Sequence, residues 1–211
     1  MSYAVKEIFL TLQGEGGQIG RTAVFCRFTG CNLWSGKEED RHQAVCQFCD
    51  TDFVGMDGEG GGRFTDAAAL ANAIETTWGT RDAQQRFVVF TGGEPLLQLD
   101  SELVHLLKQK GFYIAVETNG TLPVPDAVDW ICVSPKAGAE LVQTCGDELK
   151  LIYPQEGLNP QDFIGLKFTT FRLQPKDDAH KQEHLQKAIE FCQNHPIWHL
   201  SLQTHKLIGI P

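Results

Sequence analysis

The sequence lacks the features that mark membrane, secreted and nucleic-acid-binding proteins. No apolar run approaches the roughly 18 residues that cross a bilayer, and Met1 to Leu10 contains no apolar segment of a signal peptide. The net charge is −9, which disfavours the basic face that nucleic-acid binding requires. There is also no repeat of fixed period and no low-complexity segment. We therefore expect a cytoplasmic protein that binds neither membranes nor nucleic acid.

A disulfide framework is also missing. The seven cysteines are an odd number, and four of them are scattered along the chain: Cys26, Cys132, Cys145 and Cys192. Cys26 and Cys132 lie in apolar, strand-like runs, where a reduced thiol behaves as a small hydrophobic group. The other three cysteines lie close together in one polar segment. This distribution indicates a reducing compartment and a metal site at the clustered cysteines.

The 211 residues suffice for one domain with a substantial core, and we expect residues 1–211 to form a single domain. Apolar strand-like runs alternate with helical patterns early in the chain, and later strands follow one another with loops between them. This order predicts an α/β fold, an incomplete parallel β/α barrel of about six strands and about three helices. The helices are expected at Asp66 to Trp78, Ser101 to Lys110 and Asp178 to Asn194.

The clustered cysteines are Cys31, Cys46 and Cys49, and the last two form a C-x-x-C pair. A structural zinc site takes four protein ligands, and no fourth cysteine or histidine stands at close ligand spacing. An iron–sulfur cluster held by three thiolates would instead leave one iron open to an outside ligand. Residues 32–45, between Cys31 and Cys46, are polar and are expected to form an insertion in the loop.

Polar groups recur at the ends of the predicted strands. Thr91 to Glu94, Glu117 to Asn119, Ser134 to Lys136 and Gln174 each follow an apolar run. Taken alone, each segment reads most simply as a turn, since Gly, Pro, Asn and Ser favour turns. Ligands of parallel α/β sheets, however, bind at the carboxyl ends of the strands. The agreement of separate segments therefore predicts one shared site.

Two further features near the N-terminus allow two interpretations each. Gln13 to Gly17 ends a predicted strand and most simply forms a hairpin turn, although its glycines could also let a planar ligand approach the backbone. Arg27 alternates with Cys26 and Phe28 and so points to the opposite face. It either reaches solvent or faces the interior of the barrel as a clamp for a carboxylate.

Together these segments carry a family resemblance. The three cysteines, Thr91 to Pro95, Glu117 to Gly120 and Ser134 to Lys136 resemble the radical S-adenosylmethionine (SAM) superfamily. Leu12 to Gly16, Cys46 to Thr51 and Gln174-Pro175 are similar to the ring-contracting lyases of queuosine biosynthesis. The resemblance covers nearly the whole chain. It departs from the superfamily at one point, because the first gap of the usual C-x-x-x-C-x-x-C motif is here fourteen residues long, between Cys31 and Cys46. Loop closure entropy grows only slowly with length, so such an expansion costs little.

The resemblance implies a [4Fe–4S] cluster on Cys31, Cys46 and Cys49, with SAM on the open iron. It implies a partial barrel of the radical SAM type, and a reaction in which a SAM-derived radical initiates ring contraction of 6-carboxy-5,6,7,8-tetrahydropterin to 7-carboxy-7-deazaguanine, with loss of ammonia. The residues implied for binding SAM are Gly92, Gly93, Glu94, Glu117, Ser134, Pro135, Lys136, Gln174, Pro175, Lys176 and Asp177. Within this set, Glu94 is expected to hold an ammonium group with its carboxylate.

The resemblance also implies a pterin site and a magnesium ion. The pterin would contact Leu12, Gln13, Gly14, Glu15, Arg27, Thr91, His205 and Pro211. In the family Mg²⁺ promotes the reaction, and Thr51 occupies the position of its protein ligand. A single threonine oxygen is a weak site, so water and substrate oxygens must complete the coordination. The apolar tail from Leu207 to Pro211 is expected to fold inward toward the substrate.

Partners and alternatives remain open at this point. The chemistry calls for an electron donor such as a flavodoxin-like reductase, and the open edges of an incomplete barrel favour a homodimer. Two other functions share the three cysteines. One is a radical SAM activating enzyme that acts on a glycyl site of a protein, which the short chain and the lack of further cysteine clusters disfavour. The other is a zinc-bound interaction module without enzymatic activity.

Overall fold

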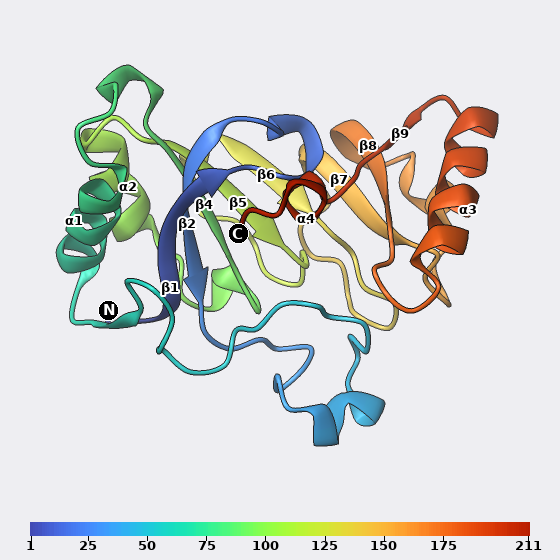
Figure 1. The fold of residues 1–211 in the computed structure, drawn as a ribbon, viewed down its shortest axis with the longest axis horizontal. Coiled ribbons are helices and arrows are strands. Elements are labelled where there is room, and N and C mark those ends of the chain that lie inside the picture. Colours follow the sequence, from blue (N-terminus) through green and yellow to red (C-terminus); the bar gives the residue numbers. More distant parts are fainter.

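The computed structural model describes all 211 residues and is built on one nine-stranded sheet in the order β3-β1-β2-β4-β5-β6-β7-β8-β9. β1 (Tyr3–Leu12) runs antiparallel to β2 (Thr22–Phe28) and to β3 (Gly62–Phe64). From β2 to β9 every neighbouring pair is parallel. The sheet curves but stays open, since β3 and β9 lie at its two ends (Figure 1). The predicted class, an incomplete parallel α/β barrel, is confirmed.

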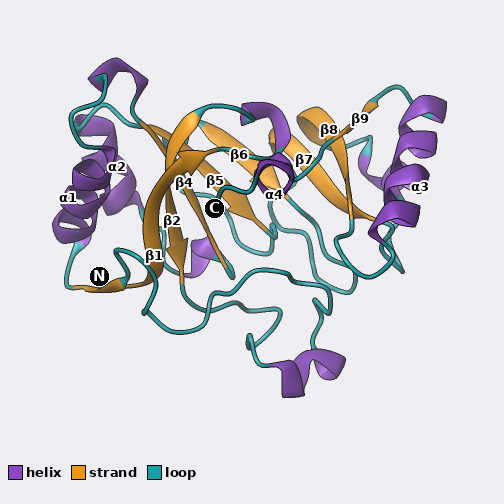
Figure 2. Cartoon of the chain, in the orientation of Figure 1, coloured by secondary structure: helices purple, strands orange, loops and turns teal.

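The remaining strands and the helices complete the fold. The strands are β4 (Phe87–Gly92), β5 (Tyr113–Thr118), β6 (Trp130–Val133), β7 (Cys145–Tyr153), β8 (Lys167–Pro175) and β9 (Trp198–Leu200). The helices are α1 (Ala67–Trp78), α2 (Ser101–Gln109), α3 (Lys181–Asn194) and α4 (Thr204–Ile208), and Figure 2 shows them around the sheet. No helix is both long enough and apolar enough to cross a membrane.

The helix boundaries follow from capping residues in the sequence. Asp66 caps α1 by accepting a hydrogen bond from the amide of Ala69, and Asp100 caps α2 through the amide of Leu103. Gly111 follows α2 with a φ of 80°, as expected for a helix stop. These two helices match their predicted positions. α3 begins three residues later than predicted, and α4 has only five residues, too few for a detectable helical period.

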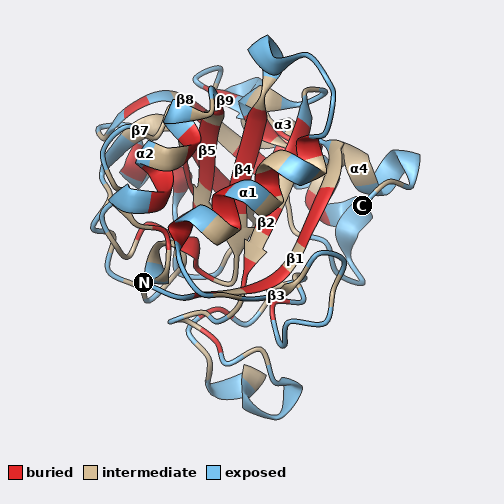
Figure 3. Ribbon diagram, turned by 90° about the vertical axis from the view of Figure 1, so that its left-hand side faces the viewer, coloured by how far each residue is buried: buried red, intermediate tan, exposed pale blue.

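The two faces of the sheet have different chemistry. The convex face carries Cys26, Phe28, Val88 and Phe90, which pack with α1 and α2 into the largest core cluster (Figure 3). The concave face has an apolar floor of Ala23, Phe87, Val89 and Ala115. Because side chains alternate along each strand, the next inward-facing residues toward the carboxyl ends are Arg27, Thr91 and Glu117. The concave face therefore changes from apolar to charged toward its mouth.

Sequence reasoning underestimated the number of strands. The sheet has nine strands rather than about six, and there are four α-helices rather than about three. β3 is only three residues long and contains Gly62, so it gives no apolar run. β9 ends at Leu200, whereas the apolar pattern predicted a strand to Gln203. These short elements are fixed by tertiary pairing and not by local pattern.

Candidate active site in the concave face

The carboxyl ends of the parallel strands open into a cavity of about 410 Å³. Its walls come from the loop after β1, residues 46–53, the ends of the central strands, and the C-terminal segment. All the predicted site residues line this cavity except Glu94 and Pro135. The lining members of that set are Leu12, Gln13, Gly14, Glu15, Arg27, Cys31, Cys46, Cys49, Thr51, Thr91, Gly92, Gly93, Glu117, Ser134, Lys136, Gln174, Pro175, Lys176, Asp177, His205 and Pro211. The prediction of one shared site is thus supported by the fold.

The three clustered cysteines meet at this cavity despite the expanded spacing. Residues 32–45 project outward from the sheet and carry an exposed 3₁₀ turn at Glu38–Gln43 (Figures 2 and 3). The insertion then returns, and the amide of Cys46 donates a hydrogen bond to the carbonyl oxygen of Leu33 at 3.3 Å. Cys31, Cys46 and Cys49 are all free thiols that line the cavity. The fold therefore supplies the path of the insertion, which the sequence left open.

The three thiols line the cavity as groups that the structure shields partly or fully from solvent. Burial raises the pKa of Cys31 and of Cys46, and the neighbouring thiols raise both further. The Lys136 ammonium opposes this rise in the pKa of Cys46. No three His, Cys, Asp or Glu side chains converge closely enough to hold one metal ion, as a zinc site would require. A cubane cluster binds each thiolate at a different corner iron, so three separated thiols around one cavity fit it.

Gly93 lets Cys31 approach the end of β4. A Cβ atom on Gly93 would lie 2.2 Å from the carbonyl oxygen of Gly30 and 2.6 Å from Cβ of Cys31. The amide of Glu94 also donates to the Gly30 carbonyl at 2.9 Å. The Gly-Gly pair after β4 therefore serves close backbone contact with the cysteine loop, in addition to forming a turn.

The structure corrects the expectation for the Glu94 side chain. Its carboxylate is fully buried and accepts hydrogen bonds from the amides of Leu96 and Asn119 and from the hydroxyl of Thr118, at 2.7–2.9 Å. Burial raises the pKa of this carboxyl group. With both oxygens occupied and no surface on the cavity, the carboxylate ties the end of β4 to the end of β5. It does not hold an ammonium group in the cavity. Pro135 likewise does not line the cavity.

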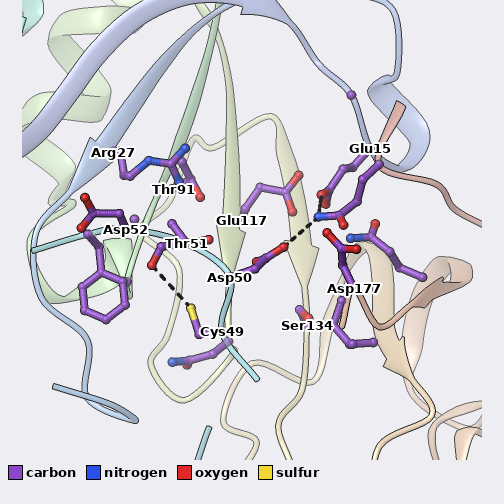
Figure 4. Close-up of a pocket in the computed structure, with 18 of the residues that line it drawn as sticks. Glu15, Arg27, Cys49, Asp50, Thr51, Asp52, Thr91, Glu117, Ser134 and Asp177 are labelled. Atoms are coloured by element: carbon purple, nitrogen blue, oxygen red, sulfur yellow. Dashed lines mark hydrogen bonds between the residues drawn. The ribbon is translucent and has the colours of Figure 1, made fainter. Parts of the chain in front are cut away.

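The charged side chains at the mouth of the cavity converge (Figure 4). Arg27 and Thr91 lie next to each other on paired strands, and the Arg27 guanidinium bonds to Glu7 at 2.7 Å. Arg27 is half-buried and faces the cavity, so its interpretation as an interior clamp is favoured over solvent exposure. Glu7 was not predicted from sequence, although its alternation with Ile8 along β1 places it on the same face.

A buried lysine that sequence reasoning missed joins two of the predicted residues. Lys150 on β7 contacts Glu15 at 2.5 Å and Glu117 at 3.0 Å. The Lys150 ammonium outweighs the effect of burial and lowers the pKa of Glu15. Burial raises the pKa of Glu117, and Glu15 and Glu148 raise it further. The lysine interrupts the apolar run L-K-L-I of β7, and this interruption was the available signal.

The C-terminal segment closes one side of the cavity. Thr204 bonds to the carbonyl oxygen of Gly14 through its amide and its hydroxyl, and the Thr11 hydroxyl donates to a Pro211 oxygen at 2.9 Å. Lys206 bridges Asp50 at 2.5 Å and Asp177 at 2.6 Å. Burial lowers the pKa of His205, which packs against Gly14. Only the end of the predicted inward tail reaches the cavity, at Pro211, whereas Leu207 and Ile208 are 73% and 62% exposed. Lys206 and Asp50 were not predicted.

Comparisons with known proteins agree with this geometry. Residues 41–141 match the model of the radical SAM superfamily, a range that includes Cys46 and Cys49. The chain is 59% identical over 211 residues to the 7-carboxy-7-deazaguanine synthase of Bordetella pertussis and 60% identical to that of Caulobacter vibrioides, with complete coverage of both chains. It also resembles the crystal structure of QueE from Escherichia coli, with a TM-score of 0.71 and 28% identity over 96% of this chain and 94% of the other.

Proposed function

The chain belongs to the 7-carboxy-7-deazaguanine synthase family of the radical SAM superfamily, and we propose from this premise how its cavity works. It is a radical SAM lyase of queuosine biosynthesis. Its reaction contracts the ring of 6-carboxy-5,6,7,8-tetrahydropterin to give 7-carboxy-7-deazaguanine and ammonia. One observation carries this function: the chain matches relatives of that activity end to end at 59–60% identity. The cavity that collects its cysteines and polar strand ends supports it.

The family implies a [4Fe–4S] cluster and SAM, and the donor set of this cavity fits both. Three free thiols supply three protein ligands and leave one iron for SAM. When bound, cluster and SAM supply a radical that removes a hydrogen atom from the substrate. The protein supplies the cradle, since Gly93 brings the end of β4 against the cysteine loop. Any side chain at position 93 would fill the space that this contact occupies.

We assign the remaining polar strand ends to SAM. The exposed backbone of Gly92 and Gly93 binds the methionine end. The carboxylate of Glu117 accepts hydrogen bonds from the ribose hydroxyls, and the hydroxyl of Ser134 donates to them or accepts from them. The ammonium of Lys136 pairs with the carboxylate of SAM. Residues 174–177 lie at the end of β8 and flank the adenine. Burial lowers the pKa of Lys136, while Cys46 and Cys49 oppose this effect, so its charge depends on the anionic groups around it.

The pterin occupies the side of the cavity nearest β1 and β2. The Arg27 guanidinium matches the geometry of a carboxylate, and Thr91 lies beside it. Glu15 is held ionised by Lys150 and accepts hydrogen bonds from the edge of the planar ring. Gln13, His205 and the backbone of residues 12–14 complete the edge contacts. Mg²⁺ would bind at Thr51, with substrate oxygens and water filling its octahedral shell.

The end of the tail reaches this side of the cavity, and the carboxylate of Pro211 meets the substrate. Pro211 already lies on the cavity wall and is tied to Thr11. Adding three residues after Pro211 should raise the KM for the pterin, because the terminal carboxylate moves away. A matched N-terminal extension of equal length serves as the control. An unchanged KM would remove the tail from the substrate site.

An anaerobic assay tests the function as a whole. The purified, cluster-loaded protein is incubated with SAM, dithionite and 6-carboxytetrahydropterin, and 5′-deoxyadenosine and the deazapurine are followed. Both products should form, and the pterin should be required for the deazapurine. Protein with about four irons per chain that forms neither product would contradict the assignment, as would colourless, zinc-loaded protein.

The partners follow from the same proposal. A flavodoxin-like or other small reductase supplies electrons to the cluster in the cytoplasm. The chain acts as one domain, because all nine strands belong to one sheet and residues 32–45 are a loop insertion within it. A homodimer would cover an open edge at β3 or β9. Sedimentation analysis over a range of concentrations measures this assembly.

A further inference from the structure

Lys150 has so far only been assigned the role of keeping Glu15 ionised, yet it also lines the cavity and contacts Glu117. Its strand, β7, pairs with β6 and β8 in the interior of the sheet. The side chain is 4% exposed, which is rare for a lysine unless its charge is matched. It lines the cavity together with Glu15 and Glu117. A charge buried at a ligand site is expensive to keep and therefore demands an explanation.

The contacts of Lys150 reach both halves of the cavity. Its ammonium bonds to Oε2 of Glu15 at 2.5 Å and to Oε2 of Glu117 at 3.0 Å. The other oxygen of Glu15 accepts from the amide of Gln203 at 2.9 Å, and that of Glu117 accepts from Gln13 at 3.2 Å. One chain of hydrogen bonds thus runs from the β1 loop through β5 and β7 to the C-terminal segment.

The charges of this network do not balance. Two carboxylates share one ammonium, and the next carboxylate, Glu148, is paired with Arg172 at 3.0 Å. Other titratable groups facing the network are Cys132, whose Sγ lies 3.6 Å from Glu148, and Lys136 and His205 on the cavity wall. Burial penalises two adjacent ionised carboxylates, so the position of the Lys150 ammonium decides which of the two is ionised more readily.

We infer that Lys150 is a positioning residue that couples the binding of the pterin to the binding of SAM. The inference rests on the proposed function, in which Glu15 meets the pterin and Glu117 meets the ribose. When the pterin donates hydrogen bonds to Glu15, these bonds stabilise part of the negative charge that the Lys150 ammonium otherwise stabilises. The ammonium then interacts more strongly with Glu117 and favours its ionised form, which accepts hydrogen bonds from the ribose hydroxyls better than the protonated form does. Each ligand therefore strengthens the binding of the other.

The test measures SAM affinity on cluster-loaded, anaerobic enzyme by titration calorimetry, with and without saturating pterin. No reductant is added, so no turnover occurs. In the wild type, pterin should lower the Kd of SAM by about fivefold or more, within the usual range of coupling between sites. In Lys150→Met the Kd of SAM without pterin should differ from the Kd with pterin by no more than about twofold, since no shared cation remains. Lys150→Arg should retain part of the coupling.

Lys150→Met leaves two buried carboxylates without a cation and can fail to fold. The double variant Lys150→Met/Glu117→Gln removes one charge of each sign and keeps the shape, so it should fold and also lose the coupling. Lys110→Met is the matched control, because Lys110 pairs with Glu75 at 2.6 Å and does not line the cavity. If Lys150 were only structural, Lys150→Met and the double variant would change stability, but the ratio of the SAM affinities with and without pterin would stay as in the wild type.

The outcomes separate the inference from the function beneath it. Wild-type enzyme that binds SAM and pterin independently would overturn the coupling and leave the function standing. Full coupling in the double variant would remove Lys150 as its carrier. Wild-type enzyme that binds neither ligand would remove the proposed function and this inference together.

Discussion

Glu94 follows β4 and Glu117 lies near the end of the neighbouring strand β5, but their surroundings give them different roles. Glu117 has one oxygen on Lys150 and the other on Gln13, and it faces the cavity. Glu94 is fully buried among three donors from the ends of β4 and β5. A sequence shows both as glutamates in turn-like segments. They differ in the direction of their side chains relative to the sheet. The short loop that contains Glu94 has no periodic pattern that would predict this direction.

Replacing Glu94 by glutamine should therefore affect folding more than ligand binding. The NH₂ group of the glutamine side chain would face backbone N–H groups, which are also donors. At least one buried donor would then lack an acceptor, at a cost of about 1–3 kcal/mol. Urea denaturation of the cluster-free protein measures this loss. Glu39→Gln, at an exposed position, should change the free energy of unfolding by less than about 0.5 kcal/mol. Wild-type stability combined with weak SAM binding would restore Glu94 to the cofactor site.

His205 gives a pH dependence whose sign follows from burial. Burial lowers the pKa of His205 below its ordinary value near 6.5, because the charged imidazolium loses solvation. As pH falls below about 6.5, the unfolded state takes up this proton before the folded state does. The contribution of His205 to folding is thus complete above that pH and decreases as pH falls toward the folded-state pKa.

Histidine ring signals in an NMR titration measure this pKa directly, and His205→Gln assigns the resonance. The imidazole of His205 should titrate below the ordinary value of about 6.5. A midpoint at or above about 6.5 would show that Glu15 and Asp50, which favour the charged form, outweigh burial.

At the level of the elements, the Gly92-Gly93 pair fixes the distance between β4 and the cysteine loop. Gly93→Ala should displace Gly30 and Cys31, since the added methyl group would overlap backbone atoms that cannot move independently. We expect the iron content after anaerobic reconstitution to fall from about four per chain to below half of that. Gly165→Ala is the matched control, because a Cβ there meets nothing within 4 Å. Full iron loading of Gly93→Ala would show that the loop tolerates the shift.

Sequence patterns predicted the elements with strong local signals. α1 and α2 were predicted because their aspartate caps lie next to apolar residues at helical spacing. β3 and α4 were missed because three and five residues carry no measurable period. The sequence pattern of the segment 53–62 indicates a flexible connection, yet the amide of Gly58 donates to the carbonyl of Lys6 and the Glu59 carbonyl accepts from the amide of Ile8. Its glycines allow close packing against β1, which composition alone does not distinguish from flexibility.

At the level of the whole molecule, the order of the parallel strands made most of the site predictable. Polar residues placed at strand ends must meet at one edge of a parallel sheet, and this rule gathered residues from 31 to 177 without any distance information. It could not provide Lys6, Lys150 or Lys206, whose roles depend on which carboxylates the folded chain brings beside them. Ion pairs between distant segments have no local signature, so they become visible only in the fold.

Because the cavity wall is drawn from both ends of the chain, its ligands should stabilise the molecule as a whole. SAM at about 100 times its Kd should add about 2.7 kcal/mol to the stability of the cluster-loaded protein. For a chain of this length, that corresponds to a rise in Tm of about 5–10 °C. Anaerobic differential scanning fluorimetry at one scan rate measures the shift. Cys31→Ala lacks one of the three thiols and should show a much smaller rise at the same SAM concentration, because the cluster that completes the SAM site is not held. An equal rise in that variant would show that SAM binds without the three-cysteine site.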